Sequence, residues 1–263
     1  MKQVLTIAGS DSGGGAGIQA DLKTMSNFSV YGASAITAVT AQNTKGVQGV
    51  EVLASDFVGK QIDSVASDLN FSAVKTGMLA NGEIVKVVAN KLVEYDFKNL
   101  VVDPVMVATS GDVLLAKEAI DILKKDLLPL AKVITPNLNE AKLLTGRNIK
   151  DEVSLEKLAK ELYQFGAEYI LVKGGHSSEK QAKDLLFTGK KLIEFSAPRL
   201  NTADLHGTGC TLSAAIASNL ALGHSVNQAV KISKDFITEA IRQGVKIGAG
   251  NNPVNHLLTT SNR

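Results

Sequence analysis

The sequence predicts one α/β domain over residues 1–263, built on a mostly parallel sheet with helices on both faces. Three observations lead to this prediction. Short β-branched runs alternate with longer amphipathic stretches from one end of the chain to the other. No linker, repeat or low-complexity segment divides the chain, and its 44% hydrophobic content is enough for a full-sized core. Late in the sequence, two apolar runs flank Thr188-Gly189-Lys190, which predicts a β-hairpin.

The elements follow in order from local pattern. Strands are predicted where β-branched runs stop at a polar residue, a glycine or a proline, because proline cannot continue strand pairing; they span residues 4–8, 35–39, 73–75, 100–103, 133–135, 169–173, 184–187 and 192–195. Helices are predicted where apolar residues recur at helical spacing; they span about 16–28, 55–69, 83–93, 116–127, 138–144, 154–165, 211–222 and 226–243. Right-handed crossovers then bring the carboxyl ends of the parallel strands to one edge, where ligands bind in such sheets.

Composition limits the function classes. A net charge of +2 gives no electrostatic case for nucleic acid or a membrane surface as partner. The single cysteine cannot form an internal disulfide, which fits a reducing compartment. No apolar run approaches a transmembrane length, and the start of the chain is too short in its apolar run for a signal peptide. We therefore expect a soluble, cytoplasmic, globular protein.

The stretch from Asp204 to Thr211 is the strongest candidate for a site. Gly207 and Gly209 allow a tight turn, and the small apolar residues that follow predict a helix. Free amides and the helix dipole attract an anion at such a terminus. Cys210 lies there, and we expect its thiol pKa to fall below the usual value of about 8.5. A small buried hydrophobe is the alternative reading of this cysteine.

A second glycine-rich loop runs from Gly9 to Gly17. Its last part fits a dinucleotide-binding pattern, but residues 40–42, at the end of the second strand, offer no acid to hold a ribose. The chain also has no P-loop motif. The loop is therefore predicted to approach another small ligand, with a turn that binds nothing as the alternative.

Single polar residues at the strand ends suggest further contacts. Lys173 either neutralises a phosphate or only reaches solvent from a strand end. Glu140 either holds Mg²⁺ or only complements a helix N-terminus, and Asp103 either is a second carboxylate near the metal or a turn residue. Asp21 and Gln42 offer an acceptor and a mixed donor–acceptor that suit a flat nitrogen heterocycle, with Thr40 and Met78 beside the ring.

Taken together, these motifs resemble the hydroxymethylpyrimidine/phosphomethylpyrimidine kinases of thiamine synthesis, which belong to the ribokinase-like superfamily. The resemblance covers nearly the whole chain in order. It rests on Gly9-Ser10-Asp11, Gly13 to Asp21, Ala41-Gln42-Asn43-Thr44, Lys75 to Leu79, Asp103 to Met106, Thr135-Pro136-Asn137 with Glu140-Ala141, Lys173 to His176 and His206 to Thr211.

The resemblance implies ATP and Mg²⁺ as cofactors and two successive phosphorylations of a pyrimidine alcohol. Residues that match the family's pyrimidine site are Gly9, Ala16, Asp21, Thr40, Gln42 and Met78. Residues that match its phosphate and metal positions are Lys173, Lys234, Thr208, Glu140 and, as the anion hole, Gly207 to Gly209. Cys210 matches the position beside the acceptor hydroxyl and is expected to be the base.

Two departures from related patterns matter. The pyridoxal kinases of the same branch share the Gly-Thr-Gly-Cys ending but carry a second cysteine after Met-Val, and here Met106-Val107 is followed by Ala108. This favours the pyrimidine kinase and leaves pyridoxal as an alternative substrate. Leu205 stands where threonine is common, which removes a hydroxyl contact to phosphate. A nicotinamide-dependent oxidoreductase and a non-catalytic binding module are the more distant alternatives, and a homodimer is expected.

Overall fold

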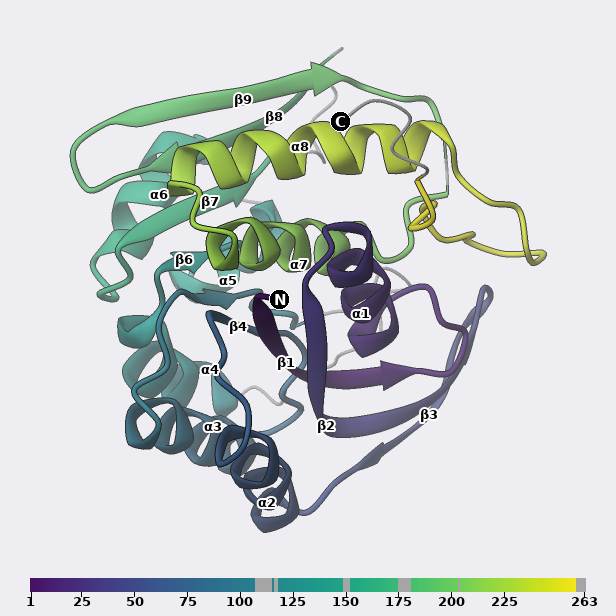
Figure 1. Cartoon of the computed structure of the whole chain (residues 1–263). Helices are drawn as coiled ribbons and strands as arrows, with labels where there is room; N and C mark the ends of the chain where they lie inside the picture. The colour runs from purple at the N-terminus through teal and green to yellow at the C-terminus, as the bar shows by residue number, and fades with distance from the viewer. Residues whose placement is uncertain (107–114, 116–117, 149–151, 175–180, 203, 259–263) are drawn as a thin grey trace.

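A nine-stranded sheet forms the centre of the molecule (Figure 1). The computed structural model describes residues 1–106, 115, 118–148, 152–174, 181–202 and 204–258. The strand order is β3-β2-β1-β4-β5-β6-β7-β8-β9. The strands are β1 (Gln3–Asp11), β2 (Tyr31–Asn43), β3 (Gly46–Val52), β4 (Ala73–Thr76), β5 (Leu100–Val102), β6 (Val133–Ile134), β7 (Tyr169–Lys173), β8 (Gln181–Phe187) and β9 (Leu192–Pro198).

The six strands from β2 to β7 along this order pair in parallel, and β3, β8 and β9 pair antiparallel with their neighbours. The predicted mostly parallel sheet and the late hairpin are therefore confirmed. Strand β3 was not predicted; its residues are exposed or half-buried throughout, so it has no buried face.

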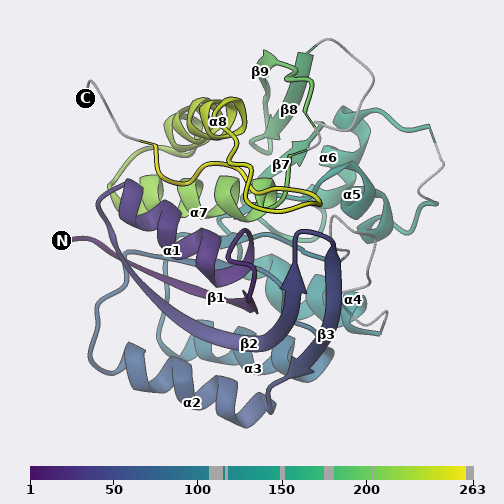
Figure 2. The same ribbon diagram turned by 90° about the vertical axis from the view of Figure 1, so that its right-hand side faces the viewer.

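Helices cover both faces of the sheet (Figure 2). Along β5, Val101 packs on one face while Leu100 and Val102 pack on the other, as the pleat of a strand requires. Val101 faces α1 (Gly17–Asn27), α7 (Thr208–Ala221) and α8 (Val226–Arg242). The other face packs on α2 (Ser55–Ala66), α3 (Gly82–Glu94), α4 (Ala119–Ile122), α5 (Leu138–Leu144) and α6 (Leu155–Tyr163).

One predicted helix differs from expectation. The region predicted as a helix over 116–127 is described from residue 118, residues 116–117 lying outside the described part of the chain. Helix α4 passes into a π-helical segment, η1 (Leu123–Leu127), and then a 3-10 turn, η2 (Leu128–Leu130). Pro129 lies in that last turn, where a residue without an N–H group cannot extend an α-helix. No helix in the described residues is long and apolar enough to cross a membrane.

Candidate active site

The predicted site residues gather where the strand order reverses. The chain adds β2 and β3 on one side of β1 and then adds β4 to β9 on the other. A crevice forms at the carboxyl ends of the strands at such a switch point. The loop after β1, the end of β2 and the residues after β4, β5 and β7 all open there, and the N-terminus of α7 lies against them (Figure 2).

The turn before α7 can be built only with glycine. Gly207 caps the helix in the left-handed region, with φ of 79° and no side-chain cap. A Cβ atom on Gly207 would stand 1.8 Å from the carbonyl oxygen of Gly15. The amide and hydroxyl of Thr208 both bond the carbonyl of Leu205, so the hydroxyl is turned toward the backbone. The first-turn amides that follow, from Gly209 on, are left to receive an anion.

A lysine and a carboxylate stand directly against this helix start. A Cβ atom on Gly209 would lie 3.3 Å from Lys173 Nζ and 3.5 Å from Asp103 Oδ2. Lys173 Nζ donates to Asp103 Oδ1 at 3.0 Å. Burial lowers the pKa of Lys173, but the charges of Asp103 and Glu140 outweigh it and raise the pKa. The ammonium is therefore charged and lies beside the predicted anion hole.

Asp103 and Glu140, the two predicted metal residues, both act on the charge of Lys173. Asp103 is 2% exposed and also accepts from Thr135 Oγ1 and Ser213 Oγ, at 3.2 and 3.1 Å. Glu140 completes the capping box of α5, where its carboxylate accepts from the Asn137 amide at 2.7 Å. Burial, with a contribution from the charge of Asp103, raises the pKa of Glu140 to about 7 although Lys173 opposes it.

This donor set fits Mg²⁺ as a partner of phosphate. Among the described residues, no three His, Cys, Asp or Glu side chains are grouped to hold a metal ion. Glu140 is a buried carboxylate whose charge is only partly compensated, and a hard cation would stabilise that charge. An ion here would draw most of its ligands from phosphate oxygens and water, with Asp103 and Glu140 as the protein's carboxylates.

The glycine-rich loop after β1 is organised by Asp11, whose role the sequence analysis missed. Its carboxylate accepts from the amides of Gly13, Gly15 and Ala16, at 2.8, 3.0 and 2.8 Å. It also meets His206 Nε2 at 2.9 Å. Burial raises the pKa of Asp11, but these hydrogen bonds and His206 outweigh burial and lower it. An aspartate two residues before a glycine run was the available signal.

Most residues of the predicted pyrimidine site come together beside this loop. Gly9 lies against Met78, since a Cβ atom there would stand 2.5 Å from Met78 Cε. Thr40 Oγ1 lies 2.9 Å from the Ser10 carbonyl and 3.2 Å from Gln42 Oε1. Ala16, also predicted to line the ring, forms the N-cap of α1 at the end of the same loop.

Asp21 was predicted to contact the ring, and its side chain is completely buried in this structure. Lys75 Nζ donates to both carboxylate oxygens of Asp21 at 2.7 and 3.0 Å, and Thr6 Oγ1 donates at 2.6 Å. Asp21 therefore joins α1 to β4 and β1, and its predicted contact with the ring stays a prediction. Lys75 is completely buried as well.

The expected pKa of Cys210 requires a correction. The Gly17 amide donates to the sulfur and the charge of Lys75 favours a thiolate, as a helix N-terminus does. Burial outweighs both and raises the pKa of the Cys210 thiol to about 11. The thiol is therefore protonated at neutral pH in the absence of ligands.

Lys234 takes part in a buried ion pair. It lies on α8, is 7% exposed and donates to Asp184 Oδ2 at 2.6 Å. The other carboxylate oxygen of Asp184 accepts from the Gly174 amide at 3.1 Å. Lys234 thus supports the chain next to Lys173, and its predicted contact with ATP stays a prediction.

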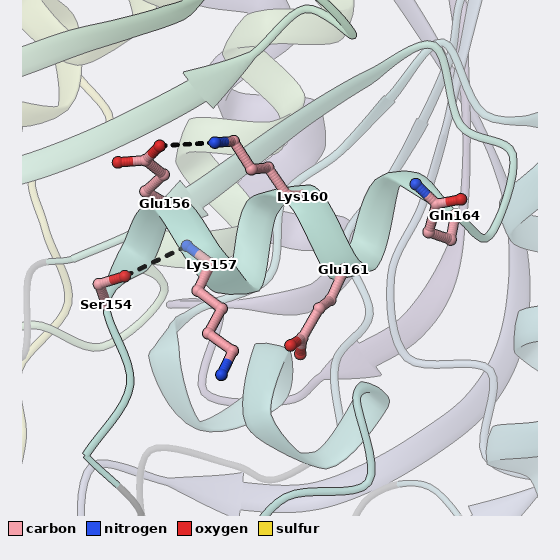
Figure 3. A pocket seen from close by; sticks show the side chains of 6 residues that line it. All are labelled: Ser154, Glu156, Lys157, Lys160, Glu161 and Gln164. Atoms are coloured by element: carbon pink, nitrogen blue, oxygen red, sulfur yellow. Dashed lines mark hydrogen bonds and ion pairs between the residues drawn. The ribbon is translucent and has the colours of Figure 1, made fainter.

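An open hollow on the surface lies elsewhere. Its volume is about 460 Å³ and it is lined by Ser154, Glu156, Lys157, Lys160, Glu161 and Gln164 (Figure 3). All six belong to α6 or its two ends, and Glu156 pairs with Lys160 at 2.7 Å along the same helix. A single solvated helix face brings no other element's groups to a ligand. We therefore place the site at the strand ends and not on α6.

Comparisons with known proteins identify the family of this chain. Residues 11–255 match the phosphomethylpyrimidine kinase family. The hydroxymethylpyrimidine/phosphomethylpyrimidine kinase of Bacillus subtilis is 47% identical over 99% of this chain and 96% of its own. The thiamine biosynthesis bifunctional protein of Geobacter sulfurreducens is 49% identical over 97% of this chain, which spans 52% of that longer protein. The crystal structure of a Bacillus subtilis pyridoxal kinase with ADP superposes with a TM-score of 0.90, at 37% identity over 97% of each chain.

Proposed function

This chain belongs to the phosphomethylpyrimidine kinase family, and we infer that it is a hydroxymethylpyrimidine/phosphomethylpyrimidine kinase of thiamine biosynthesis. It phosphorylates 4-amino-5-hydroxymethyl-2-methylpyrimidine and then the monophosphate, with ATP as donor. One observation in the site supports this most directly: the uncapped start of α7 faces the ammonium of Lys173. Amides and a fixed positive charge at one point are what a transferring phosphoryl group requires.

The chain's own groups divide the work of phosphoryl transfer. The transition state is loose, with charge spread over the phosphoryl oxygens, so alignment and neutralisation matter most. The amides of Gly209 and Cys210 would hold the transferring group, with Gly207 setting the turn, and Lys173 would share its charge. Asp103 keeps Lys173 in place through the 3.0 Å ion pair. Asp103 and Glu140 would hold Mg²⁺, which neutralises phosphate charge when bound.

The acceptor would lie on the other side of α7's start. Gln42 offers donor and acceptor groups to a ring edge, with Met78, Gly9, Thr40 and Ala16 around it. The Cys210 sulfur accepts from the Gly17 amide, next to Ala16, and Cys210 would accept the proton of the hydroxyl group late in the transfer. General-base assistance of this kind contributes about 10²–10⁴-fold to a rate.

Pyridoxal kinase activity is the second candidate, because the fold superposes closely on that of a pyridoxal kinase. ATP consumption should be measured in parallel with hydroxymethylpyrimidine, its monophosphate and pyridoxal. We expect turnover with the first two and weaker turnover with pyridoxal. Preference for pyridoxal would reverse the assignment. Binding of the pyrimidine without ATP consumption would indicate a binding module, and a nicotinamide titration should show no binding.

The expected homodimer and the single domain are carried forward as proposals. Val50 and Val52 expose 44% and 40% of their surface on strand β3, which lies at one edge of the sheet, and this supports a second copy as the partner there. Sedimentation equilibrium would report the mass, with a monomer contradicting the dimer. A cytoplasmic location stays a prediction from the sequence.

A further inference from the structure

His206 links the two halves of the site through side chains. Its Nε2 lies 2.9 Å from Asp11 Oδ2, which organises the glycine-rich loop, and 3.4 Å from the side-chain amide of Gln42. The ring is wedged against the loop, since a Cβ atom on Gly15 would stand 2.6 Å from His206 Cδ2. Within the described part of the chain, the polar contacts of this nitrogen are those with Asp11 and Gln42. His206 therefore has a fixed position beside Gln42.

The hydrogen on this nitrogen is assigned by its partner. Asp11 is 3% exposed and also accepts from three backbone amides, so its carboxylate is a buried, ionised acceptor. An ionised carboxylate cannot donate, and so the His206 Nε2 atom carries the hydrogen of the 2.9 Å contact. That hydrogen is directed mainly to Asp11, so the nitrogen can share it with a second acceptor at Gln42 but cannot itself accept from the Gln42 amide.

Thr40 imposes the matching condition on the other end of the amide. Its hydroxyl group has a single hydrogen, which is directed to the Ser10 carbonyl at 2.9 Å. The hydroxyl oxygen, 3.2 Å from Oε1 of Gln42, can therefore only accept from the amide. The backbone of Gln42 is held on both sides, because its amide and carbonyl both bond Ser12 Oγ, at 2.8 and 2.9 Å. Only the terminal amide of Gln42 is free to turn.

We propose that His206 and Thr40 together lock the Gln42 amide with its oxygen toward His206 and its nitrogen toward Thr40. The opposite orientation sets the Nε2 atoms of Gln42 and His206 against each other as two donors, and two oxygens against each other at Thr40. A half-turn of the amide replaces the two facing donors at His206 with an oxygen that shares the hydrogen on His206 Nε2 with Asp11, and it converts the contact at Thr40 into a hydrogen bond. His206 is in this sense a positioning residue that acts on the substrate through Gln42.

The locked amide makes a prediction about the ring that it recognises. One lone pair of the oxygen and one N–H remain, and these present an acceptor beside a donor. An aminopyrimidine edge is complementary, because its ring nitrogen accepts and its exocyclic amine donates. The amine would lie on the His206 side and the ring nitrogen on the Thr40 side. This rests on the proposed function, which supplies the pyrimidine.

The test uses an analogue with the reversed hydrogen-bond pattern. In 5-hydroxymethyl-2-methylpyrimidin-4-one the ring N–H donates and the exocyclic oxygen accepts, so binding requires the Gln42 amide to turn. Turning gives up the hydrogen bond to Thr40 and sets the two donors at His206 against each other again, and we expect wild-type protein to bind the amine on the order of 10- to 100-fold more tightly than the oxo compound. Calorimetry without ATP measures both dissociation constants.

Two variants of equal size separate positioning from packing. His206→Gln keeps a donor that Asp11 can hold, and its amine-to-oxo ratio should stay within about threefold of wild type. His206→Leu removes the donor, and the ratio should fall at least tenfold while the KM for ATP and the melting temperature stay close to those of His206→Gln. Thr40→Val should lower the ratio as well, and it carries the test if His206→Leu does not fold.

Equal binding of the two heterocycles to wild-type protein, or an unchanged ratio in the folded His206→Leu and Thr40→Val variants, would overturn the role of His206. No binding of either heterocycle would instead contradict the proposed function. The two failures are thereby distinguishable.

Discussion

At the scale of single residues, Cys210 is subject to opposing effects on its thiol. The start of α7, the Gly17 amide and the charge of Lys75 all favour the thiolate, while burial favours the thiol and raises its pKa to about 11. The proton of the acceptor hydroxyl would therefore move to Cys210 only when transfer is well advanced and the oxygen has become acidic. Such a base accepts no proton until the bond between the acceptor oxygen and the phosphoryl group has begun to form.

Because Cys210 is the chain's only cysteine, its state can be followed directly. We predict that iodoacetamide alkylates it at pH 7.5 at least about tenfold more slowly than it alkylates glutathione, since a higher pKa lowers the thiolate fraction.

We also predict that Cys210→Ala lowers kcat for the pyrimidine alcohol on the order of 10²-fold with little change in KM. An unchanged kcat would show that the residue only packs.

The site residues differ in how far sequence could place them. Gly207, Lys173 and Gln42 were predicted because a motif or a strand end carries each of them toward one edge. The ion pair of Asp21 was not predicted, since its partner Lys75 lies 54 residues away and no local pattern shows that the two meet in the core. The contact between Asp11 and His206 was missed for the same reason, because 195 residues separate them.

At the scale of elements, the segment after α8 braces the start of α7. Asn252 is 4% exposed, and its side chain donates to Asp204 Oδ1 at 3.0 Å, while its carbonyl accepts from the His206 amide. Further along, His256 Nε2 lies 2.9 Å from Thr211 Oγ1 in the first turn of α7. The chain between 244 and 258 thereby holds the loop that carries the anion site.

The buried histidine of this segment predicts a pH dependence of stability. Burial, with the charges of Lys23 and His206, lowers the pKa of His256 to about 4. As the pH falls below about 6.5, His256 is protonated in the unfolded chain but stays neutral in the folded chain. The contribution of His256 to the free energy of unfolding is therefore fully present above pH 6.5 and is lost as the pH falls toward 4. The loss amounts to roughly 3 kcal/mol at most.

Urea denaturation of wild type and His256→Gln from pH 7 to pH 4 would measure this effect. Glutamine can still donate to Thr211 but does not titrate, so the difference between the two proteins isolates His256 from all other groups. We expect wild type to lose more stability than the variant over this range. Parallel curves would contradict the prediction.

Periodicity identified most elements because it reports which face of a helix or strand is buried. Helix α6 and strand β7 were predicted to within two residues for this reason. Strand β3 lies at one edge of the sheet, with exposed side chains on both of its faces, so no period marks it. The π-helical segment η1 lies between α4 and the turn that contains Pro129, and it packs on α3. Local sequence periodicity does not report such packing, so this segment was not predicted.

At the scale of the whole molecule, the site lies over a buried ion pair at the switch point of the sheet. Lys75 on β4, Asp21 on α1 and Thr6 on β1 meet with the lysine and aspartate side chains fully covered. A Cβ atom on Gly77 would stand 2.8 Å from Lys75 Nζ, so the pair reaches the floor of the crevice. Through Thr6, the ion pair therefore joins β1 to β4, the two neighbouring strands at the switch point, below the residues proposed to bind the acceptor.

This arrangement predicts an asymmetric response to mutation. Lys75→Met leaves Asp21 charged and buried without its partner, and breaking such a pair typically costs about 3–5 kcal/mol of unfolding free energy. Lys75→Met with Asp21→Asn removes both charges at nearly constant volume and should recover most of that loss. Lys231→Met breaks the exposed pair with Asp235 on α8 and should cost under about 1 kcal/mol, which controls for the substitution itself. Urea denaturation at neutral pH measures the free energy of unfolding of all three variants. A double variant no more stable than Lys75→Met would mean that packing, and not charge, determines stability where α1, β1 and β4 meet.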